Sequence, residues 1–338
     1  MRSTSSATNM MCQGFGCFTI RAGLSASALA ALAAGLLFQG VEVKAGGLMP
    51  PQVSNTSGQD YYQNAVTLID LPAEDLANDL PELSGLVPAR DQQELPRLLN
   101  AVGASVEESY QKFTEVVADE QVTQVRCGPS GRLTKSVHRR FNYLILARHE
   151  AGLERIEEYR AAADGEPGQG LAGDFFSEGF ASMWALFYPG NQPGSRFRYL
   201  GRQRIGDGTV NVIGCAQRPG WSAVLGFENA SGRRILLMYQ GVAWIDAATN
   251  KIVKMRAELL KPRLDVQLEL QTTEIQFGKV DLSDAASTSL WVPLQVTVTT
   301  VWNGEVIRNE HQHSNYRLPG SNSKIKSSEE ISLPPQAN

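Results

Sequence analysis

The sequence lacks the local motifs by which many catalytic sites are recognised. It contains neither a G-x-S-x-G nucleophile turn nor a phosphate-binding loop. His149 and Glu150 are not followed by the second histidine of a zinc-protease helix. We therefore expect a protein that is not an enzyme. An envelope enzyme is kept as a third alternative, because catalytic triads are assembled in space and not along the chain.

Histidine is scarce, with four residues in 338, which limits the possible metal sites. His311 and His313 would share one face of a strand, but a zinc site needs a third and a fourth ligand. His138 and His149 are the only other histidines, and both are far away in sequence. We therefore expect His311 and His313 to be exposed polar strand positions, and we expect no metal.

One glycine run has the spacing of a dinucleotide-binding turn. Residues 168–173 read GQGLAG and fit G-x-G-x-x-G. Such a site needs a buried parallel strand directly before the glycines and an acidic residue about 20 positions later. Neither is present in the sequence pattern, since residues 153–160 are rich in charge like an exposed strand. We expect a loop that leads into a helix, and no cofactor.

Basic residues are not concentrated in any one predicted element. The chain has 31 Lys and Arg against 35 Asp and Glu, and its net charge is −4. Proteins that bind nucleic acid usually carry a basic patch or stripe. The scattered charge therefore excludes nucleic acid as an expected partner.

Cysteine is also scarce, and only two of the four residues are expected in the mature chain. Cys12 and Cys17 precede the apolar stretch described below, so Cys127 and Cys215 remain. A pair of cysteines in an oxidising compartment predicts a Cys127–Cys215 disulfide. The alternative is two separately buried thiols that behave as small apolar residues.

The N-terminal residues have the pattern of a secretory signal peptide. Arg21 is followed by an uncharged stretch over residues 22–38, which is somewhat short for the roughly 20 apolar residues of a membrane-spanning helix. Small residues at Val43 and Ala45 predict cleavage after Ala45. No cysteine follows the stretch closely, so lipidation is not expected there. We expect a periplasmic or secreted protein without a transmembrane segment after cleavage; a retained N-terminal anchor is the alternative.

The mature chain is expected to begin and end with disordered segments. Residues 46–58 and 319–338 hold few core-forming residues and no sustained apolar pattern. Residues 59–126 are predicted to form a helical N-terminal segment, in which the apolar spacing from 95 to 117 indicates an amphipathic helix. A second helix is predicted near residues 174–187, where aromatic residues are frequent and Pro189 follows.

Most of residues 127–318 alternates between apolar and polar positions, as half-buried strands do. Phe141, Tyr143 and Ile145 share one predicted face. Three short connections indicate hairpins: Gly206-Asp207-Gly208, Ala248-Thr249-Asn250 and Asn303-Gly304. The prediction is an α+β domain, a curved antiparallel β-sheet with helices on its concave face.

Several stretches carry a more specific resemblance. Residues 240–255 read QGVAWIDAATNKIVKM, and four further stretches are Tyr159-Arg160, PGSRF at 193–197, AQRPGW at 216–221 and LWVP at 290–293. Through residues 240–255 and its order of elements, the chain resembles the half-barrel of outer-membrane lipoprotein carriers (LolA-like). Through the other four stretches it resembles a group of uncharacterised exported bacterial proteins. The resemblance to the carriers implies a curved sheet around an apolar concavity that holds acyl chains in known members. It implies no catalytic residues.

The leading functional hypothesis is non-catalytic binding of a hydrophobic or acylated ligand. The residues expected to line its site are Phe175, Phe180, Trp184, Val253, Met255, Leu268 and Leu270. The same aromatic residues also suit the ordinary core of a helix packed on a sheet. The alternative function is an envelope interaction module, with a filled concavity and a protein partner on the outer face of the sheet.

We expect the exported protein to begin at Gly46, because signal peptidase prefers small residues at the positions of Val43 and Ala45. Removing residues 1–45 leaves 293 residues and changes the net charge from −4 to −6. N-terminal sequencing of the periplasmic form measures the cleavage point. Recovery only in membranes, with residues 22–38 intact, would show a retained anchor.

Overall fold

The computed structural model describes residues 61–112, 115–150, 153–163, 179–219, 225–228, 234–282 and 289–318. The predicted signal peptide (1–45), leader (46–58), glycine run (168–173) and tail (319–338) lie outside the described residues. Within those residues, no helix is long and apolar enough to cross a membrane.

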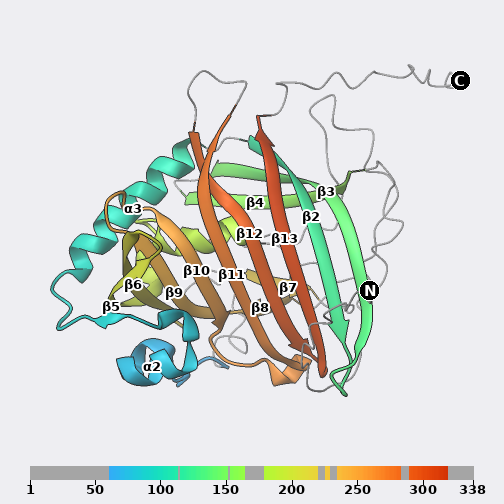
Figure 1. The fold of residues 1–338 in the computed structure, drawn as a ribbon, viewed down its shortest axis with the longest axis horizontal. Helices are drawn as coiled ribbons and strands as arrows, with labels where there is room; N and C mark the ends of the chain where they lie inside the picture. Colours follow the sequence, from blue (N-terminus) through green and yellow to red (C-terminus); the bar gives the residue numbers. More distant parts are fainter. Residues whose placement is uncertain are drawn as a thin grey trace, which may run out of the picture.

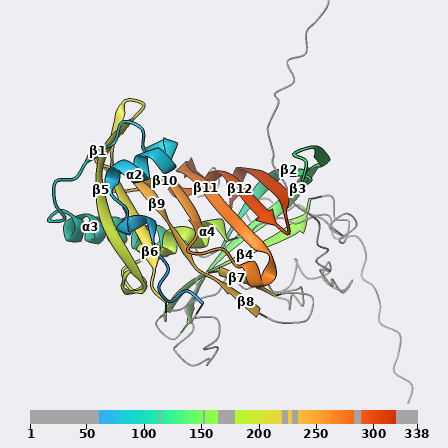
Figure 2. The ribbon, with the colours of Figure 1, turned by 90° about the horizontal axis from the view of Figure 1, so that it is seen from below.

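One antiparallel sheet of 11 strands forms the protein, in the order β1-β5-β6-β9-β10-β11-β12-β13-β2-β3-β4. Figures 1 and 2 show that the sheet is strongly bent and that α4 lies inside the bend. The predicted curved antiparallel sheet with helices is confirmed. Its strands are β1 (Val87–Pro88), β2 (Glu115–Cys127), β3 (Leu133–Glu150), β4 (Leu153–Ala162), β5 (Ser195–Ile205), β6 (Gly208–Gln217), β9 (Tyr239–Asp246), β10 (Ile252–Leu259), β11 (Leu268–Asp281), β12 (Ser289–Trp302) and β13 (Glu305–Arg317). A separate two-stranded sheet pairs β7 (Leu225–Glu228) with β8 (Arg234–Leu237).

The three predicted hairpins are present. Residues 206–207 connect β5 to β6, and residues 247–251 connect β9 to β10. Asn303 and Gly304 connect β12 to β13, with φ values of 46° and 74°. Two successive positive φ values belong to the type I′ turn, whose twist matches that of paired strands. These local turns set the register of the neighbouring long strands.

The predicted amphipathic helix is α3 (Leu95–Lys112), which lies on the concave side of the sheet. Its buried face includes Leu98, Val102, Val106 and Tyr110. The helix ends before the predicted residue 117, and β2 begins at Glu115. The expected boundary between a helical segment (59–126) and the sheet is therefore wrong. Residues 115–127 alternate at period two, and their backbone pairs with β13 on one side and β3 on the other.

The second predicted helix is shorter than expected within the described residues. It consists of α4 (Phe180–Met183), followed without a break by the 3₁₀ turn η3 (Trp184–Phe187). We refer to residues 180–187 as the cover. Gly179 precedes it with φ 93°, a left-handed conformation that suits glycine. A further 3₁₀ turn, η4 (Gln192–Gly194), leads into β5.

The N-terminal segment packs on the opposite face of the sheet. It comprises η1 (Leu68–Asp70), α2 (Ala73–Asp79) and η2 (Pro81–Leu83), and it ends in β1, which pairs with β5. Together with apolar residues of β5, β6 and β9, this segment forms a second core. Trp244 is fully buried there, and its Nε1 donates to Oε1 of Gln203 at 2.8 Å. Half-buried strands would leave the outer face exposed to solvent, but at this end of the sheet the N-terminal segment covers that face.

The predicted disulfide is not formed. Cys127 lies at the end of β2 and Cys215 in β6, and both are buried thiols. Five strands lie between β6 and β2 in the sheet order. A disulfide needs Cα atoms within about 7 Å, so the sheet separates the pair. The structure agrees with the alternative of two separately buried thiols. Burial raises the pKa of the Cys215 thiol to about 12.

We expect Cys215 of the native protein to resist iodoacetamide at about pH 8, because only the thiolate reacts and burial suppresses it. After unfolding in guanidinium, both Cys127 and Cys215 should be alkylated without prior reduction. Peptide mapping by mass spectrometry measures both states. A disulfide-linked peptide containing Cys127 and Cys215 in the native protein would contradict the expectation.

Candidate functional site

The concave side of the sheet contains four of the predicted lining residues. Phe180 and Trp184 belong to the cover, Met255 to β10 and Leu268 to β11, and all four lie in one apolar cluster. Trp184 stacks on Phe277, with ring centroids 5.8 Å apart and an interplanar angle of 18°. The cover thus joins the sheet through aromatic contacts. Phe175 lies outside the described residues.

Two predicted lining residues lie elsewhere. Val253 packs against the outer core, because the β9–β10 register shifts between Ile252 and Lys254. Leu270 is 41% exposed, since a register shift between Leu268 and Leu270 interrupts the alternation in β11. A bulge places two successive residues against one partner and so moves a side chain to the other face. The alternation of the sequence alone did not reveal these two irregularities.

The concavity is filled where the structure describes it. The cover side chains of Phe180, Met183, Trp184 and Phe187 are 0–2% exposed. Inward residues of α3 and of the central strands surround them. The alternative in which the aromatic residues form a core therefore describes this conformation. A ligand in the same space would have to replace the cover.

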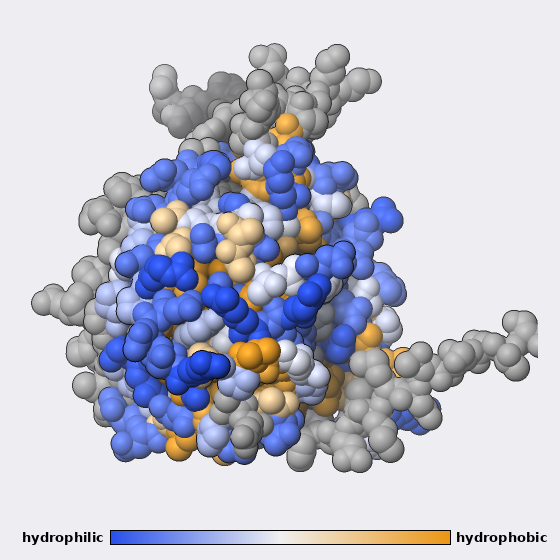
Figure 3. Space-filling view, turned by 60° about the vertical axis from the view of Figure 1, so that its left-hand side comes forward, coloured by the Kyte–Doolittle hydropathy of each residue, from blue (hydrophilic) through white to orange (hydrophobic). Residues whose placement is uncertain are grey.

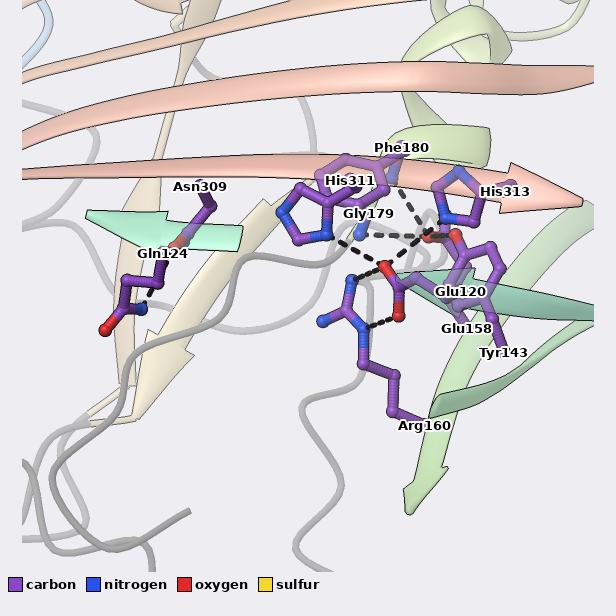
Figure 4. A network of polar contacts seen from close by, with 10 residues as sticks. All are labelled: Glu120, Gln124, Tyr143, Glu158, Arg160, Gly179, Phe180, Asn309, His311 and His313. Carbon is purple, nitrogen blue, oxygen red and sulfur yellow. Dashed lines mark hydrogen bonds and ion pairs between the residues drawn. The ribbon is translucent and has the colours of Figure 1, made fainter. Parts of the chain in front are cut away.

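A polar network lies at the other end of the concavity, where β13, β2, β3 and β4 run side by side (Figure 4). Arg160 of β4 forms a bidentate ion pair with Glu120 of β2, with Nη2 2.8 Å from Oε1. Nδ1 of His311 lies 2.8 Å from the same Oε1, and Nε2 of His313 lies 3.3 Å from it. The register brings the groups together, because His313 is the cross-strand partner of Glu120.

These positions correct two expectations. His311 and His313 share a face as predicted, but they are buried and not exposed. Residues 153–160 were interpreted as an exposed strand, yet Glu158 is 3% exposed. No group of three metal-binding side chains is present among the described residues.

The sequence pattern did not identify Glu120, Arg160 or Glu158 as site residues, although the position of Glu120 within its strand is unusual. Glu120 occupies the apolar phase of β2, between Ala118 and Val122, which are both buried. A carboxylate in the buried phase of a strand requires a partner, because an unpaired buried charge is strongly unfavourable. The partners come from β4 and β13 and are distant in sequence, so the alternation identifies the position but not the network.

Glu158 ties the cover to β4. Its Oε2 accepts hydrogen bonds from the backbone N–H groups of Gly179 (3.0 Å) and Phe180 (2.9 Å). Its Oε1 accepts from the N–H and the hydroxyl of Ser182, both at 3.0 Å. The hydroxyl of Tyr143 also donates to Oε2. One carboxylate thus satisfies the N-terminal amides of the cover that have no partner within the turn.

The electrostatics of the network fix its protonation state. Burial would raise the pKa of Glu120, but the charge of Arg160 and the hydrogen bonds of the network hold it well below its usual range. Burial lowers the pKa of His311 to about 4, against the opposing effect of Glu120. At neutral pH His311 is therefore neutral and donates through Nδ1. Its Nε2 and the Nδ1 of His313 are buried and have no hydrogen-bond partner among the described residues.

His311 should make the stability of the protein depend on pH. Its pKa is about 4 in the folded protein and about 6.5 when unfolded, so the unfolded state binds more protons between these values. The free energy of unfolding should fall by up to about 3 kcal/mol as the pH falls from about 6.5 to about 4. His311→Gln keeps a donor and removes the titration, so denaturant unfolding of this variant should depend less on pH.

The matched control is His138→Gln, because His138 is exposed on β3 and its ring Nδ1 bonds to the hydroxyl of Thr123. This variant should keep the pH dependence of the wild type. If the free energy of unfolding depends on pH equally in the wild type and in His311→Gln, then His311 does not titrate as the geometry indicates.

Comparisons with known proteins give a likeness of fold. No protein-family model and no curated protein matches the sequence. Among solved structures, a DUF1329 family protein from Desulfovibrio piger aligns with a TM-score of 0.37 and 10% identity, over 68% of this chain and 94% of that one. An outer membrane lipoprotein-sorting protein domain from Vibrio parahaemolyticus aligns with a TM-score of 0.35 and 11% identity, over 66% and 94%. The second of these is a lipoprotein-sorting domain, the kind of protein that the order of elements in the sequence resembles, but likenesses this distant indicate no ligand or activity for this chain.

Proposed function

We propose that this protein is exported to the periplasm and binds a hydrophobic or acylated ligand in the concavity of its sheet, without catalysis. The observation that carries the proposal is the construction of the cover. Residues 180–187 form two short turns that fill the concavity with apolar side chains. Their first turn is held by Glu158. A ligand can therefore exchange with the cover side chains while the anchor stays in place.

The free energy gained by burying the cover side chains is comparable to that gained by burying a long acyl chain. The cover buries Phe180, Met183, Trp184, Leu186 and Phe187. At roughly 1.5–3 kcal/mol for each side chain, their exposure would cost roughly 8–15 kcal/mol. An acyl chain of about 16 carbons gains about 12 kcal/mol on burial, at about 0.8 kcal/mol for each methylene. A single long chain can offset most of the cost of moving the cover.

The polar groups of the concavity support a binding role and not a catalytic one. Glu120 and Arg160 are engaged with each other, and Glu158 is engaged with the cover and with Tyr143. His311 directs its proton to Glu120. A general base or nucleophile must reach the substrate with a free polar atom. The geometry instead uses these groups to connect β2, β4 and β13 with the cover, and the ring nitrogens of His311 and His313 that lack a partner among the described residues are buried.

The filled concavity also favours the second candidate, an interaction module that binds an envelope protein. Such a module needs an exposed apolar patch. Within the described residues, the exposed large apolar side chains are distributed over separate elements: Val66, Val87, Leu133, Ile205, Leu264 and Leu270. The N-terminal segment already covers part of the outer face. We therefore prefer the ligand-binding proposal.

The proposal predicts that monopalmitoylglycerol changes the fluorescence of Trp184 and raises the melting temperature with ligand concentration. Trp184 would leave its stack on Phe277, so its emission should shift to longer wavelength. Trp184→Phe identifies its signal among the five tryptophans. Titration by fluorescence and by thermal unfolding measures both effects.

A pair of variants on β10 tests where the ligand binds. Met255→Gln places a polar group on the apolar wall and should weaken the response at least about fivefold, since burying an unpaired amide costs roughly 1–3 kcal/mol. Lys254→Gln changes the neighbouring side chain on the outer face and should respond like the wild type. Circular dichroism confirms that both variants fold. A wild-type protein that ignores the lipid would favour the interaction module.

A further inference from the structure

A pocket of about 420 Å³ opens where β5, the start of α3 and η1 meet. Three arginines line it, together with two polar and three apolar residues: Arg196, Arg198, Arg218, Asp70, Gln92, Ile69, Leu95 and Phe197. Figure 3, with the side of α3 and β5 turned forward, shows strongly hydrophilic side chains beside smaller hydrophobic areas. The sequence pattern did not predict this pocket, because Arg196 and Arg198 come from β5, Arg218 follows the end of β6, and the other walls come from two further segments.

The pocket carries an excess of positive charge. Arg196 is paired with Asp70, with contacts of 2.7 and 3.0 Å, and also donates to Thr67. Arg198 donates to the backbone carbonyls of Ile69 and Leu71, and Arg218 donates to the carbonyl of Ser195. Within the described parts of the chain, neither Arg198 nor Arg218 meets a carboxylate. Three guanidinium groups against one carboxylate favour an anionic ligand.

The edge of β5 adds a backbone donor to this charge. The N–H and C=O of Tyr199 point away from β6 and bond to the side chain of Gln92, at 2.8 and 3.0 Å. Backbone groups alternate in direction along a strand, so the N–H of Phe197, two residues earlier, points to the same edge. β1 pairs with β5 only at Gly201 and Arg202. Among the described residues, no strand pairs with this edge of β5 along the pocket, so a ligand can reach it.

The pocket also borders the apolar interior. The Phe197 ring contacts Phe187 of the cover, with centroids 5.2 Å apart. Leu95, the first residue of α3, packs against the concave core. Arg196 and Arg198 contact the N-terminal segment on the outer face, so an acyl chain that replaced the cover near Phe187 would reach the arginines past Phe197, at the edge of β5. The arrangement is that of a site for an amphiphile, with charged and apolar parts in contact.

We propose that this arginine pocket binds the anionic group, a phosphate or carboxylate, of an amphiphile whose chain enters the concavity beside Phe197. The inference rests on the proposed function and specifies its ligand class. Arg198 and Arg218 hold the oxyanion by charge-assisted hydrogen bonds, and the N–H of Phe197 provides a further donor. Arg196 and Asp70 stabilise the wall of the pocket through their ion pair.

The test compares two lipids that differ by one group. Lysophosphatidic acid with a palmitoyl chain carries a phosphate that monopalmitoylglycerol lacks. We expect calorimetric titration of the wild-type protein to show at least about tenfold tighter binding of the phosphate-bearing lipid. Arg218→Gln should remove most of this advantage, and added salt should reduce it. Arg218 is exposed and bonds to one carbonyl, so its replacement should leave the fold intact.

Arg204→Gln is the matched control, because Arg204 is an exposed residue of β5 that does not line the pocket. It should keep the full preference for the phosphate-bearing lipid. Arg198→Gln should act like Arg218→Gln, with thermal unfolding used to check the contact of Arg198 with the N-terminal segment. Equal affinity of the wild type for both lipids would overturn the arginine site and leave the proposed function standing.

Binding of inorganic phosphate, measured beside that of the two lipids, distinguishes the remaining outcomes of the test. Phosphate that binds weakly and is lost in Arg218→Gln, together with the lipid preference, supports the proposal. Phosphate binding without binding of either lipid would overturn both the amphiphile and the proposed function. Binding of neither phosphate nor lipid would overturn both as well.

Discussion

The structure depends on burying both faces of its sheet along β6 and β9, where nearly every residue is buried. A single layer of strands cannot do so, and each face needs its own cover. The inner face packs against α3 and residues 180–187, and the outer face packs against residues 61–86. β6 and β9 are therefore almost entirely buried. This constraint explains why the chain places helical segments both before and within the sheet.

The other end of the concavity is held together differently. There β2, β4 and β13 meet through Glu120, Arg160 and the two histidines. Replacement of a buried ion pair by apolar residues is often neutral for stability, whereas removal of one partner is costly. The pair therefore favours one specific arrangement of these strands. Glu158 and Arg160 both lie on β4, and Glu158 accepts a hydrogen bond from the first residue of the cover. β4 therefore connects the polar network with the cover.

The cover and the arginine pocket give the protein two distinct chemical environments in contact. Phe187 and Phe197 lie at the junction, with aromatic side chains on one side and guanidinium groups on the other. Apolar burial is non-directional and gives affinity. Charged hydrogen bonds are directional and give selectivity. A ligand that makes both apolar contacts and charged hydrogen bonds would bind here more selectively than in a purely apolar core.

Local sequence patterns were sufficient for much of the fold. The spacing of apolar residues predicted α3, and the Asn303-Gly304 turn predicted the β12–β13 hairpin. Phe141, Tyr143 and Ile145 share a buried face as expected. These features depend on interactions within a few residues, or on a period of two or about 3.6. They can be read without knowing which strands become neighbours.

The sequence by itself thus determined the fold class, the main helix, the hairpins and four of the residues in the apolar cluster. Only the tertiary structure decided that Val253 and Leu270 leave that cluster, because bulges depend on the partner strand. It separated Cys127 from Cys215, and it brought His311 and His313 inward to Glu120. Each of these outcomes is set by contacts between segments up to about 200 residues apart, which no local period records.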